Sequence, residues 1–383
     1  MGPLQGSKFI EIAGIGPSQL CGMLLADMGA EVIRIDRISS ADQGLELPYR
    51  YQLLNRGRKS IAVNLKDPEG AALVLRLCTQ ADALFEGFRP GVMERLGLGP
   101  EQCMGQNPRL VYGRMTGWGQ AGSLASAAGH DPNYIAITGV LDCIGERGGA
   151  PVLPLNLIGD FGGGGVYLAM GLLAGVLEAG KSGQGQVIDC SMVDGAASLM
   201  TLFYGMLAAG AWEPQRGHNI LDGGAHFFNV YKTLDDKFIV IAPMEPRFYR
   251  IFLDKLGIED PAFEKQYDPG AWPELKEKLQ ARFLTRTRDQ WCEFFEGTDA
   301  CVSPVLGLEE APCYPFNKER ATFVEYDGIV QPAPAPRFSR TREGIQGAPD
   351  APGAHTLEVL EGWGITKAEL RELQDREVIS QSG

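Results

Sequence analysis

Residues 9–37, FIEIAGIGPSQLCGMLLADMGAEVIRIDR, decide the fold class of this 383-residue chain. Two apolar runs of strand length flank a helical stretch, with Pro17 where a first helical turn accepts proline and Gly29 where the helix can stop. Two such runs with a helix between them form a βαβ unit, in which the strands are parallel. The segment therefore predicts an α/β fold.

The same alternation of strand-like and helical stretches continues to about residue 190. Further strand-like runs stand at 61–65, 83–88 and 187–192, and an amphipathic stretch at 68–81 follows Asp67, which can cap a helix. These stretches extend the predicted parallel sheet and make the first half of the chain one large domain.

The second half of the chain has a different pattern. FFNVYKTLDDKFIVIA (227–242) predicts a hairpin, because two alternating runs are joined by LDD. Three amphipathic helices are expected after it, at 247–257, 272–284 and 288–297. We therefore expect a smaller α+β domain, followed by an extended Pro- and Gly-rich connection at 312–353 and a last helical pair.

The composition argues against several classes of partner and site. The formal net charge is −13 without a long Lys or Arg run, so we expect no nucleic-acid partner. The eight cysteines lack C-x-x-C and zinc-type spacing, which predicts reduced thiols, a cytoplasmic protein and no metal site. No signal peptide is apparent, and the apolar stretch 161–177 is short of a membrane span. We expect a buried helix there and no membrane partner.

The turn after the first strand imitates a dinucleotide-binding fingerprint. Gly14 and Gly16 stand between strand and helix, and Asp36 follows about 20 residues later. Gln19 occupies the third glycine position, and Pro17 removes an N–H that a pyrophosphate would use. A plain βα turn is therefore favoured over NAD binding.

Several basic residues are expected where parallel strands end. Arg37 and Lys66 follow two strands, and Arg89 and Arg95 follow a third. Open α/β sheets collect anionic ligands at this edge, although solvated surface charge or pairing with carboxylates is the ordinary alternative.

The stretch GHDPNY (129–134) places His130 directly before Asp131 and Pro132. Asp followed by Pro is typical of an N-cap and a first helical turn, so we expect Asp131 to cap a helix. A helix start lowers the pKa of a nearby histidine and offers donors to an oxyanion. From these residues alone, a catalytic histidine and an incidental one beside a cap are equally supported.

Two carboxylates are further candidates. Asp160 precedes four glycines and an apolar run, so it is expected near a helix N-terminus as an acid/base group, or as a cap with glycines used for tight packing. Glu245 ends the predicted hairpin before Pro246, where it can orient a histidine or only favour the helix dipole. The motifs of serine hydrolases, zinc proteases and P-loop proteins do not occur.

Six stretches of the chain form a more specific combination. They are EGFRPGVMERLGLGP (86–100), AGHDPNY (128–134), PLNLIGDFGGG (154–164), GQGQVIDCSMVDG (183–195), NILDGGA (219–225) and TDACVSPVL (298–306). Together they resemble the class III CoA-transferase family of the CaiB/BaiF type, and within it the members that racemise acyl-CoA thioesters. The resemblance runs from about residue 4 to residue 340.

This resemblance implies a fold and an assembly. The family fold is an interlocked homodimer of two threaded rings, with a Rossmann-like large domain built from both chain ends and a small central domain. We expect the large CoA-binding domain at 1–190 plus 335–383, linkers at 191–228 and 313–334, and the small α+β domain at 229–312.

The resemblance also implies an activity. It is that of a racemase or epimerase that inverts the α-carbon of 2-methyl-branched acyl-CoA thioesters in fatty acid metabolism. His130 and Asp160 would be the two catalytic bases, Glu245 of the second subunit would partner His130, and the N–H of Asp131 would face the thioester oxygen. One base removes the acidified α-proton and an acid on the opposite face returns one, through a shared enolate. Coenzyme A is part of the substrate, and no separate cofactor is implied.

The acyl-CoA substrate would contact a larger set of residues, most of them after the predicted strands. By the resemblance they are Arg37, Val63, Asn64, Leu65, Lys66, Glu86, Gly87, Phe88, Arg95, Gly129, Tyr134 and Asn156.

The chain departs from the racemase pattern at a few positions. Pro132 replaces a common Ile and should be harmless in a first helical turn, whereas His226 replaces Pro and IAPMEP replaces VGAIEP around Met244. We expect the last two to alter substrate size or pose near Glu245.

Two other functions stay open. One is a CoA-transferase of the same family, in which Asp131 attacks the thioester and carries CoA between carboxylic acids. The other is a non-catalytic CoA-binding homologue, suggested by the substitutions near Glu245.

Overall fold

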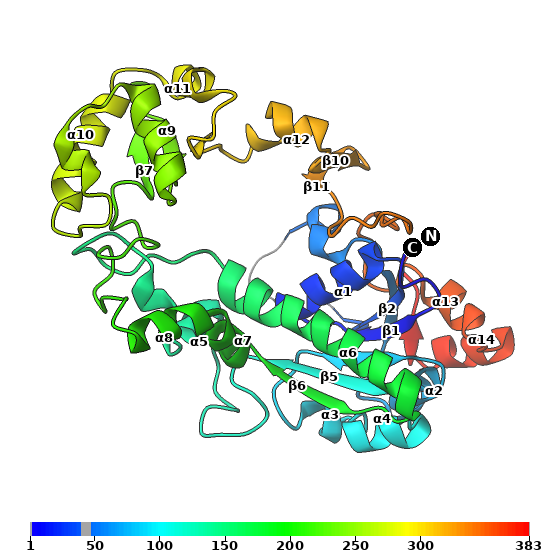
Figure 1. Ribbon diagram of the computed structural model, residues 1–383. Helices are drawn as coiled ribbons and strands as arrows, with labels where there is room; N and C mark the ends of the chain where they lie inside the picture. Colours follow the sequence, from blue (N-terminus) through cyan, green and yellow to red (C-terminus); the bar gives the residue numbers. More distant parts are fainter. Residues whose placement is uncertain (1, 40–46, 383) are drawn as a thin grey trace. The chain divides into compact units, whose positions relative to one another are not determined.

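The computed structural model describes residues 2–39 and 47–382, which form two compact units (Figure 1). The larger unit contains both ends of the chain: residues up to Thr138, Leu155–Leu199, and the residues from Arg320 onward. The smaller unit contains Gly139–Pro154 and Met200–Glu319. The chain therefore leaves the larger unit twice and returns to it twice.

A seven-stranded sheet forms the centre of the larger unit. Its strands lie in the order β12-β3-β2-β1-β4-β5-β6, and each neighbouring pair is parallel except β12 with β3. The strands are β1 (Lys8–Ile12), β2 (Glu31–Asp36), β3 (Lys59–Val63), β4 (Ala83–Glu86), β5 (Val111–Thr116), β6 (Val187–Ser191) and β12 (Ile379–Ser380). The predicted α/β fold is confirmed, with an antiparallel edge strand that the sequence pattern did not predict.

The strand order positions a ligand site. Parallel strands in the order 3-2-1-4-5-6 form a Rossmann-like sheet, whose connections reverse direction between β1 and β4. In open sheets of this type, ligands bind outside the carboxyl ends of the strands at that reversal. The segments that follow β1 and β4 are therefore where a site is expected.

Helices cover both faces of the sheet (Figure 1). On one face, Phe9 and Val32 pack with Leu25 of α1 and Leu172 of α6. On the other face, strand residues such as Ile10 pack with α2, α4, α13 and α14. The helices are α1 (Pro17–Asp27), α2 (Pro68–Cys78), α3 (Val92–Arg95), α4 (Pro100–Gln106), α5 (Asp131–Ala136), α6 (Tyr167–Ser182), α7 (Met192–Leu199), α13 (Thr356–Gly362) and α14 (Lys367–Asp375).

One long helical stretch precedes β6. A π-helical segment, η4 (Leu157–Val166), runs directly into α6. By length and composition alone, Leu157–Ser182 could cross a membrane. Within its most apolar 18 residues, 39% are buried. Leu168 and Leu172 are fully buried, but Met170 and Leu177 are 58% and 67% exposed. The expectation of a buried helix is therefore correct for one face only.

The smaller unit is built on a three-stranded antiparallel sheet in the order β7-β8-β9. The predicted hairpin is confirmed, because β7 pairs with β8 through Lys232 opposite Phe238. The predicted helices are also confirmed, and their aromatic residues form the core, with Phe252, Phe283 and Trp291 fully buried. The elements are α8 (Thr201–Ala208), β7 (Asn229–Lys232), β8 (Phe238–Ile241), α9 (Pro246–Leu256), α10 (Trp272–Phe283), α11 (Arg288–Phe295), β9 (Val302–Pro304) and α12 (Pro315–Glu319).

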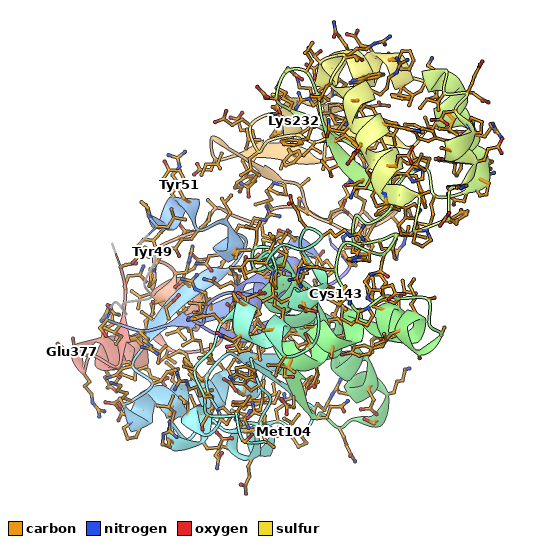
Figure 2. The ribbon with its side chains drawn as sticks, turned by 90° about the vertical axis from the view of Figure 1, so that its left-hand side faces the viewer. Tyr49, Tyr51, Met104, Cys143, Lys232 and Glu377 are labelled. Atoms are coloured by element: carbon orange, nitrogen blue, oxygen red, sulfur yellow. The ribbon has the colours of Figure 1, made fainter. Side chains whose placement is uncertain are left out.

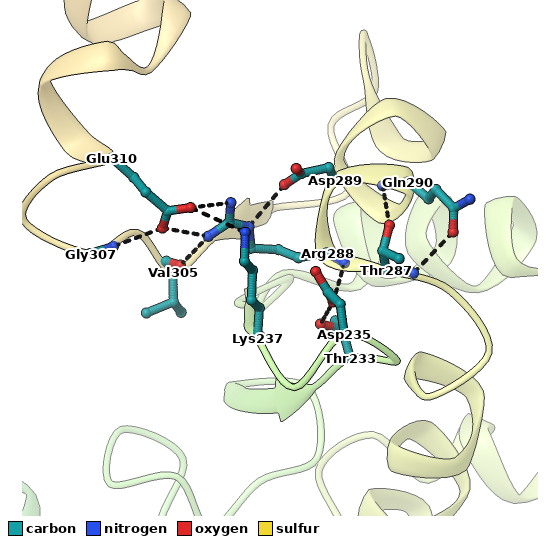
Figure 3. Close-up of polar contacts among 10 residues, drawn as sticks. All are labelled: Thr233, Asp235, Lys237, Thr287, Arg288, Asp289, Gln290, Val305, Gly307 and Glu310. Carbon is teal, nitrogen blue, oxygen red and sulfur yellow. Dashed lines mark hydrogen bonds and ion pairs between the residues drawn. The ribbon is translucent and has the colours of Figure 1, made fainter.

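A buried arginine joins the hairpin turn to the end of this sheet (Figure 3). Arg288 is 5% exposed and donates two hydrogen bonds of 2.8 Å to Glu310. These bonds hold the pKa of the Glu310 carboxyl far below its usual range. The backbone N–H of Arg288 also donates to Asp235 in the hairpin turn, at 2.9 Å.

The segments predicted as linkers contain regular structure. Residues 191–228 include α7 and α8, and residues 313–334 include α12 and a hairpin of β10 (Phe323–Tyr326) and β11 (Ile329–Pro332). The extended connection expected at 312–353 is therefore regular in its first half. Beyond it, the predicted last helical pair is confirmed as α13 and α14.

Candidate active site

A cavity of about 420 Å³ opens in the larger unit where β1, β4 and β5 end. Residues 15–18 and 87–90, which follow β1 and β4, line it together with residues 115–118 at the end of β5. His130, Tyr134, Asn156 and Asp160 also line this cavity. The structure thus brings together the two catalytic candidates of the larger unit, His130 and Asp160, although 30 residues separate them in the sequence.

His130 is exposed at the start of α5. It occupies the N-cap position itself, and its backbone N–H donates to the side-chain oxygen of Asn133 at 3.0 Å. The expectation that Asp131 caps this helix is wrong, because Asp131 is already the first helical residue. Tyr134, one turn later, donates its hydroxyl to the backbone oxygen of Gly129 and fixes the loop before His130.

The Asp131 carboxylate binds a different helix. Its side chain is buried, 2% exposed, and one carboxylate oxygen accepts the backbone N–H of Asp160 at 2.8 Å. Gly159 allows this approach, since a Cβ at that position would lie 2.5 Å from the same oxygen. Within the described residues, the second oxygen of Asp131 has no hydrogen-bond partner. The carboxylate therefore joins the start of α5 to the start of η4.

Asp160 is half-buried in the cavity wall. It lies in the first turn of η4, and the side-chain amide of Asn156 donates to its carboxylate at 3.1 Å. Burial raises the pKa of Asp160 and the nearby Asp131 charge raises it further, while Asn156 and His130 lower it. A carboxyl group with a raised pKa is suited to accept and return a proton near neutral pH.

The turn after β1 lies against Asp160. Gly16 has a positive φ of 63°, and a Cβ at this position would come within 3.1 Å of an Asp160 carboxylate oxygen. The Gln19 side chain accepts the Gly16 N–H at 3.2 Å and donates to Asn55, which accepts from Arg58. The Gly16 N–H is therefore used within the turn, which favours the plain βα turn over a dinucleotide site.

The four glycines after Asp160 serve packing. A Cβ on Gly163 would lie 2.6 Å from the backbone nitrogen of Ala196 in α7, and one on Gly164 would lie 2.9 Å from Pro17 in α1. Glycines therefore let η4 approach both helices, and this contact holds Asp160 beside the turn at Gly16.

A second cavity, of about 860 Å³, opens where β2 and β3 end. Of the residues predicted to bind the substrate, it is lined by Arg37, Val63, Asn64, Leu65, Lys66 and Phe88. The first cavity is lined by Gly87, Phe88, Gly129, Tyr134 and Asn156. Phe88 lines both, and Arg37 lies 5.9 Å from its ring. One extended ligand can therefore occupy both cavities by passing this ring.

Two predicted binding residues lie beside the cavities without lining them. Glu86 is fully buried and accepts the Phe88 N–H at 2.6 Å, so it shapes the loop that separates the cavities. Burial raises the pKa of Glu86 to about 7. Arg95 is exposed at the end of α3, whereas its neighbours Val92 and Leu96 line the second cavity.

Glu245 belongs to the smaller unit, where it is exposed at the N-cap of α9. The Met244 backbone oxygen accepts bonds from Gln266 at 2.8 Å and Tyr267 at 2.6 Å, which hold the turn before it. His226 is fully buried and its ring bonds to the Tyr249 hydroxyl at 2.7 Å. Burial lowers the pKa of His226 to about 4, so the ring is a neutral core group rather than a residue facing substrate.

Some lining residues had no signal in the sequence. Gln374, Arg376 and Gln381 line the second cavity from the end of the chain, and Met115 and Met192 line the first. Among the described residues, no group of three or more His, Cys, Asp or Glu side chains is arranged to hold a metal ion.

Replacing Asn156 by leucine tests the environment of Asp160. The substitution removes the amide that favours the charged carboxylate, so the pKa of Asp160 rises and its deprotonation moves to higher pH. Carbon-13 NMR titration of aspartate carboxyl groups measures this, with the Asp160 signal assigned from the Asp160→Asn variant. The signal of Asp67, which caps α2, is the internal control. An unchanged or lowered Asp160 midpoint would contradict the assignment.

Comparison with known proteins places the chain in a family. A family model described as CoA-transferase family III matches residues 4–356. A Mus musculus protein named alpha-methylacyl-CoA racemase is 43% identical over 379 residues, which cover 98% of this chain and 97% of that protein. The Homo sapiens protein of the same name is 42% identical, and the match covers 99% of this chain and 98% of that protein. Human succinyl-CoA:glutarate CoA-transferase is 28% identical, and the match covers 94% of this chain and 85% of that protein.

Solved structures share the fold. A crystal structure of Rv3272 from Mycobacterium tuberculosis has a TM-score of 0.77 and 26% identity, with 93% of this chain and 98% of that chain covered. A CAIB/BAIF family protein from Brucella suis has a TM-score of 0.81 at 23% identity, with 94% and 99% covered, and shows likeness of fold alone. The family model and the two relatives above 40% identity extend over nearly the whole chain. The chain therefore belongs to CoA-transferase family III.

Proposed function

We propose that this protein is a racemase or epimerase that inverts the α-carbon of 2-methyl-branched acyl-CoA thioesters. One observation carries the proposal: His130 and Asp160 line a single cavity while the Asp131 carboxylate is buried on the Asp160 backbone. The two relatives named alpha-methylacyl-CoA racemase, at 43% and 42% identity, support the same activity.

The proposed chemistry needs a proton acceptor and a proton donor on opposite faces of the α-carbon. In one direction the Asp160 carboxylate removes the α-proton, and the electron pair moves onto the thioester oxygen as an enolate. Protonated His130 returns a proton to the other face, which leaves a neutral imidazole and a protonated Asp160. The opposite epimer runs the same steps in reverse and restores both charges. The N–H of Asp131, at the start of α5, is the proposed donor to the enolate oxygen.

The position of Asp131 argues against the CoA-transferase alternative. A nucleophilic carboxylate must reach the thioester carbon, but this one is 2% exposed and accepts the Asp160 N–H at 2.8 Å. An attack would break that bond and free the backbone of the proposed base. The carboxylate therefore suits a structural role better than a covalent one.

We assign the coenzyme A part of the substrate to the second cavity. Arg37 and Lys66 line it at the ends of β2 and β3 and would bind phosphates, while Phe88 and the 63–65 backbone would contact the pantetheine arm and adenine. Arg95, next to this cavity, would add positive charge at its rim.

We also propose that the enzyme is an interlocked homodimer in which Glu245 of the partner subunit approaches His130. The larger unit exposes Met170 and Leu177 on α6, and the smaller exposes Leu202 and Tyr204 on α8. Large apolar side chains exposed on these two helices favour burial against another chain. A carboxylate beside His130 would stabilise the imidazolium form that returns the proton.

Hydrogen exchange tests the proposed activity. The enzyme in deuterium oxide should introduce deuterium at the α-position of both epimers of a 2-methylacyl-CoA while interconverting them. His130→Ala and Asp160→Asn should each abolish interconversion, because inversion needs both groups. A variant that still exchanges one epimer identifies the face of the remaining base.

Mass spectrometry and chiral separation of the acyl group supply the measurement. Wild-type enzyme that binds the thioester without incorporating deuterium would contradict the proposal and support a non-catalytic CoA-binding role.

Mixed dimers test the origin of Glu245. Neither His130→Ala nor Glu245→Ala homodimers should be active. Co-expression with two affinity tags yields a heterodimer with one mutation on each chain, and this species should regain one working site, because an intact His130 then meets an intact Glu245. An inactive heterodimer, or a monomer in light scattering at micromolar concentration, would contradict the proposed assembly.

A further inference from the structure

The second cavity has a wall that comes from the end of the chain. Gln374 and Arg376, at the end of α14, and Gln381, after β12, line it together with residues at the ends of β2 and β3. Neither the family motifs nor the predicted binding residues include this segment. The side chains of this segment line the cavity, and the proposed function assigns no role to them.

Backbone pairing fixes this wall beside β3. Val378 accepts the Asn64 N–H at 2.8 Å, and the antiparallel strand β12 places Ile379 opposite Val63. Val378 and Ile379 are buried in the core under the sheet. Arg376 thus stands on an anchored segment rather than on a free tail.

Strand order sets the direction in which a CoA ester must lie. The catalytic cavity is at the ends of β1, β4 and β5, while the Arg376 wall stands beyond β3 at the opposite part of the sheet. From β4 to β3 the sheet spans three strand spacings, about 14 Å. With the thioester at His130, the part of coenzyme A that reaches farthest is the 3′-phosphorylated adenosine, because the diphosphate lies between the adenosine and the pantetheine arm.

The charges around this wall suit a phosphate. Arg37, Lys66 and Arg376 line the cavity with Asp36 and Glu377. The Asp36 carboxylate already has partners, since it accepts bonds from Arg34 at 2.7 Å and Ser60 at 2.6 Å. Glu377 is exposed at the surface of the C-terminal segment, where Figure 2 labels it.

We infer that Arg376 is an additional substrate-binding residue, which binds the 3′-phosphate of coenzyme A. The inference rests on the proposed function for the orientation of the ligand. Arg376 pairs with Glu69 at 2.5 Å, but both side chains are well exposed, at 61% and 40%. An exposed ion pair of this kind stabilises little, so a phosphate can take the place of Glu69 on the guanidinium.

Calorimetric titration of the full-length protein with coenzyme A and with 3′-dephospho-coenzyme A tests the inference without any catalytic readout. Arg376→Gln should weaken binding of coenzyme A about tenfold, the usual effect of losing one charge-assisted bond. The same variant should bind 3′-dephospho-coenzyme A within about twofold of wild type, because that ligand lacks the group Arg376 holds.

Two variants are matched controls. Glu69→Gln breaks the same ion pair but keeps the guanidinium, so it should bind coenzyme A at least as tightly as wild type. Arg371→Gln removes an equal charge from α14, where Arg371 is exposed and outside the cavity, and should leave both affinities unchanged. Unchanged coenzyme A binding by Arg376→Gln, or an equal loss for both ligands, would overturn the inference. If coenzyme A binds as expected but no racemisation occurs, the proposed activity fails and the assignment of Arg376 stands.

Discussion

The candidate site depends on one hydrogen bond, from the Asp160 N–H to the Asp131 carboxylate. It connects the first turn of α5 to the first turn of η4, and so places His130 and Asp160 on one cavity. The bond is partly buried and its acceptor is a carboxylate, which makes it stronger than an ordinary amide bond and costly to break. Because Asp131 follows His130 directly in the chain, any shift of this carboxylate moves both proposed bases.

The surrounding fold supports this bond from two directions. The glycines of η4 let it pack against α1 and α7, and the Gln19 side chain holds the turn at Gly16 beside the Asp160 carboxylate. The Rossmann-like strand order then aligns the catalytic cavity with a second cavity that shares Phe88 with it. A long ligand can therefore lie along the carboxyl edge of the sheet with its reactive end at His130.

Much of this arrangement could be predicted from the sequence, because local patterns determine it. The alternation in residues 9–37 predicted the parallel sheet, and LDD between two alternating runs predicted the hairpin. The role of Asp131 could not be predicted, since Asp before Pro suits a helix cap equally well and its real partner lies 29 residues away. Strand β12 could not be predicted because two residues are too few to show an alternating pattern. The position of Arg376 in the wall of the second cavity could not be predicted for the same reason. The departure at His226 was expected to affect substrate, but the ring lies in a core that no local pattern reveals.

The most direct test of a structural Asp131 compares Asp131→Asn with Asp131→Ala in α-proton exchange. Asparagine keeps an oxygen that can accept the Asp160 N–H, so this variant should retain most of the exchange rate. Alanine removes that acceptor and no longer holds Asp160 in place, so it should lower the exchange rate by about tenfold or more. Wild-type enzyme quenched during turnover should carry no acyl or CoA adduct on Asp131. An adduct on this residue, with Asn as inactive as Ala, would show that Asp131 attacks the thioester and would contradict the account.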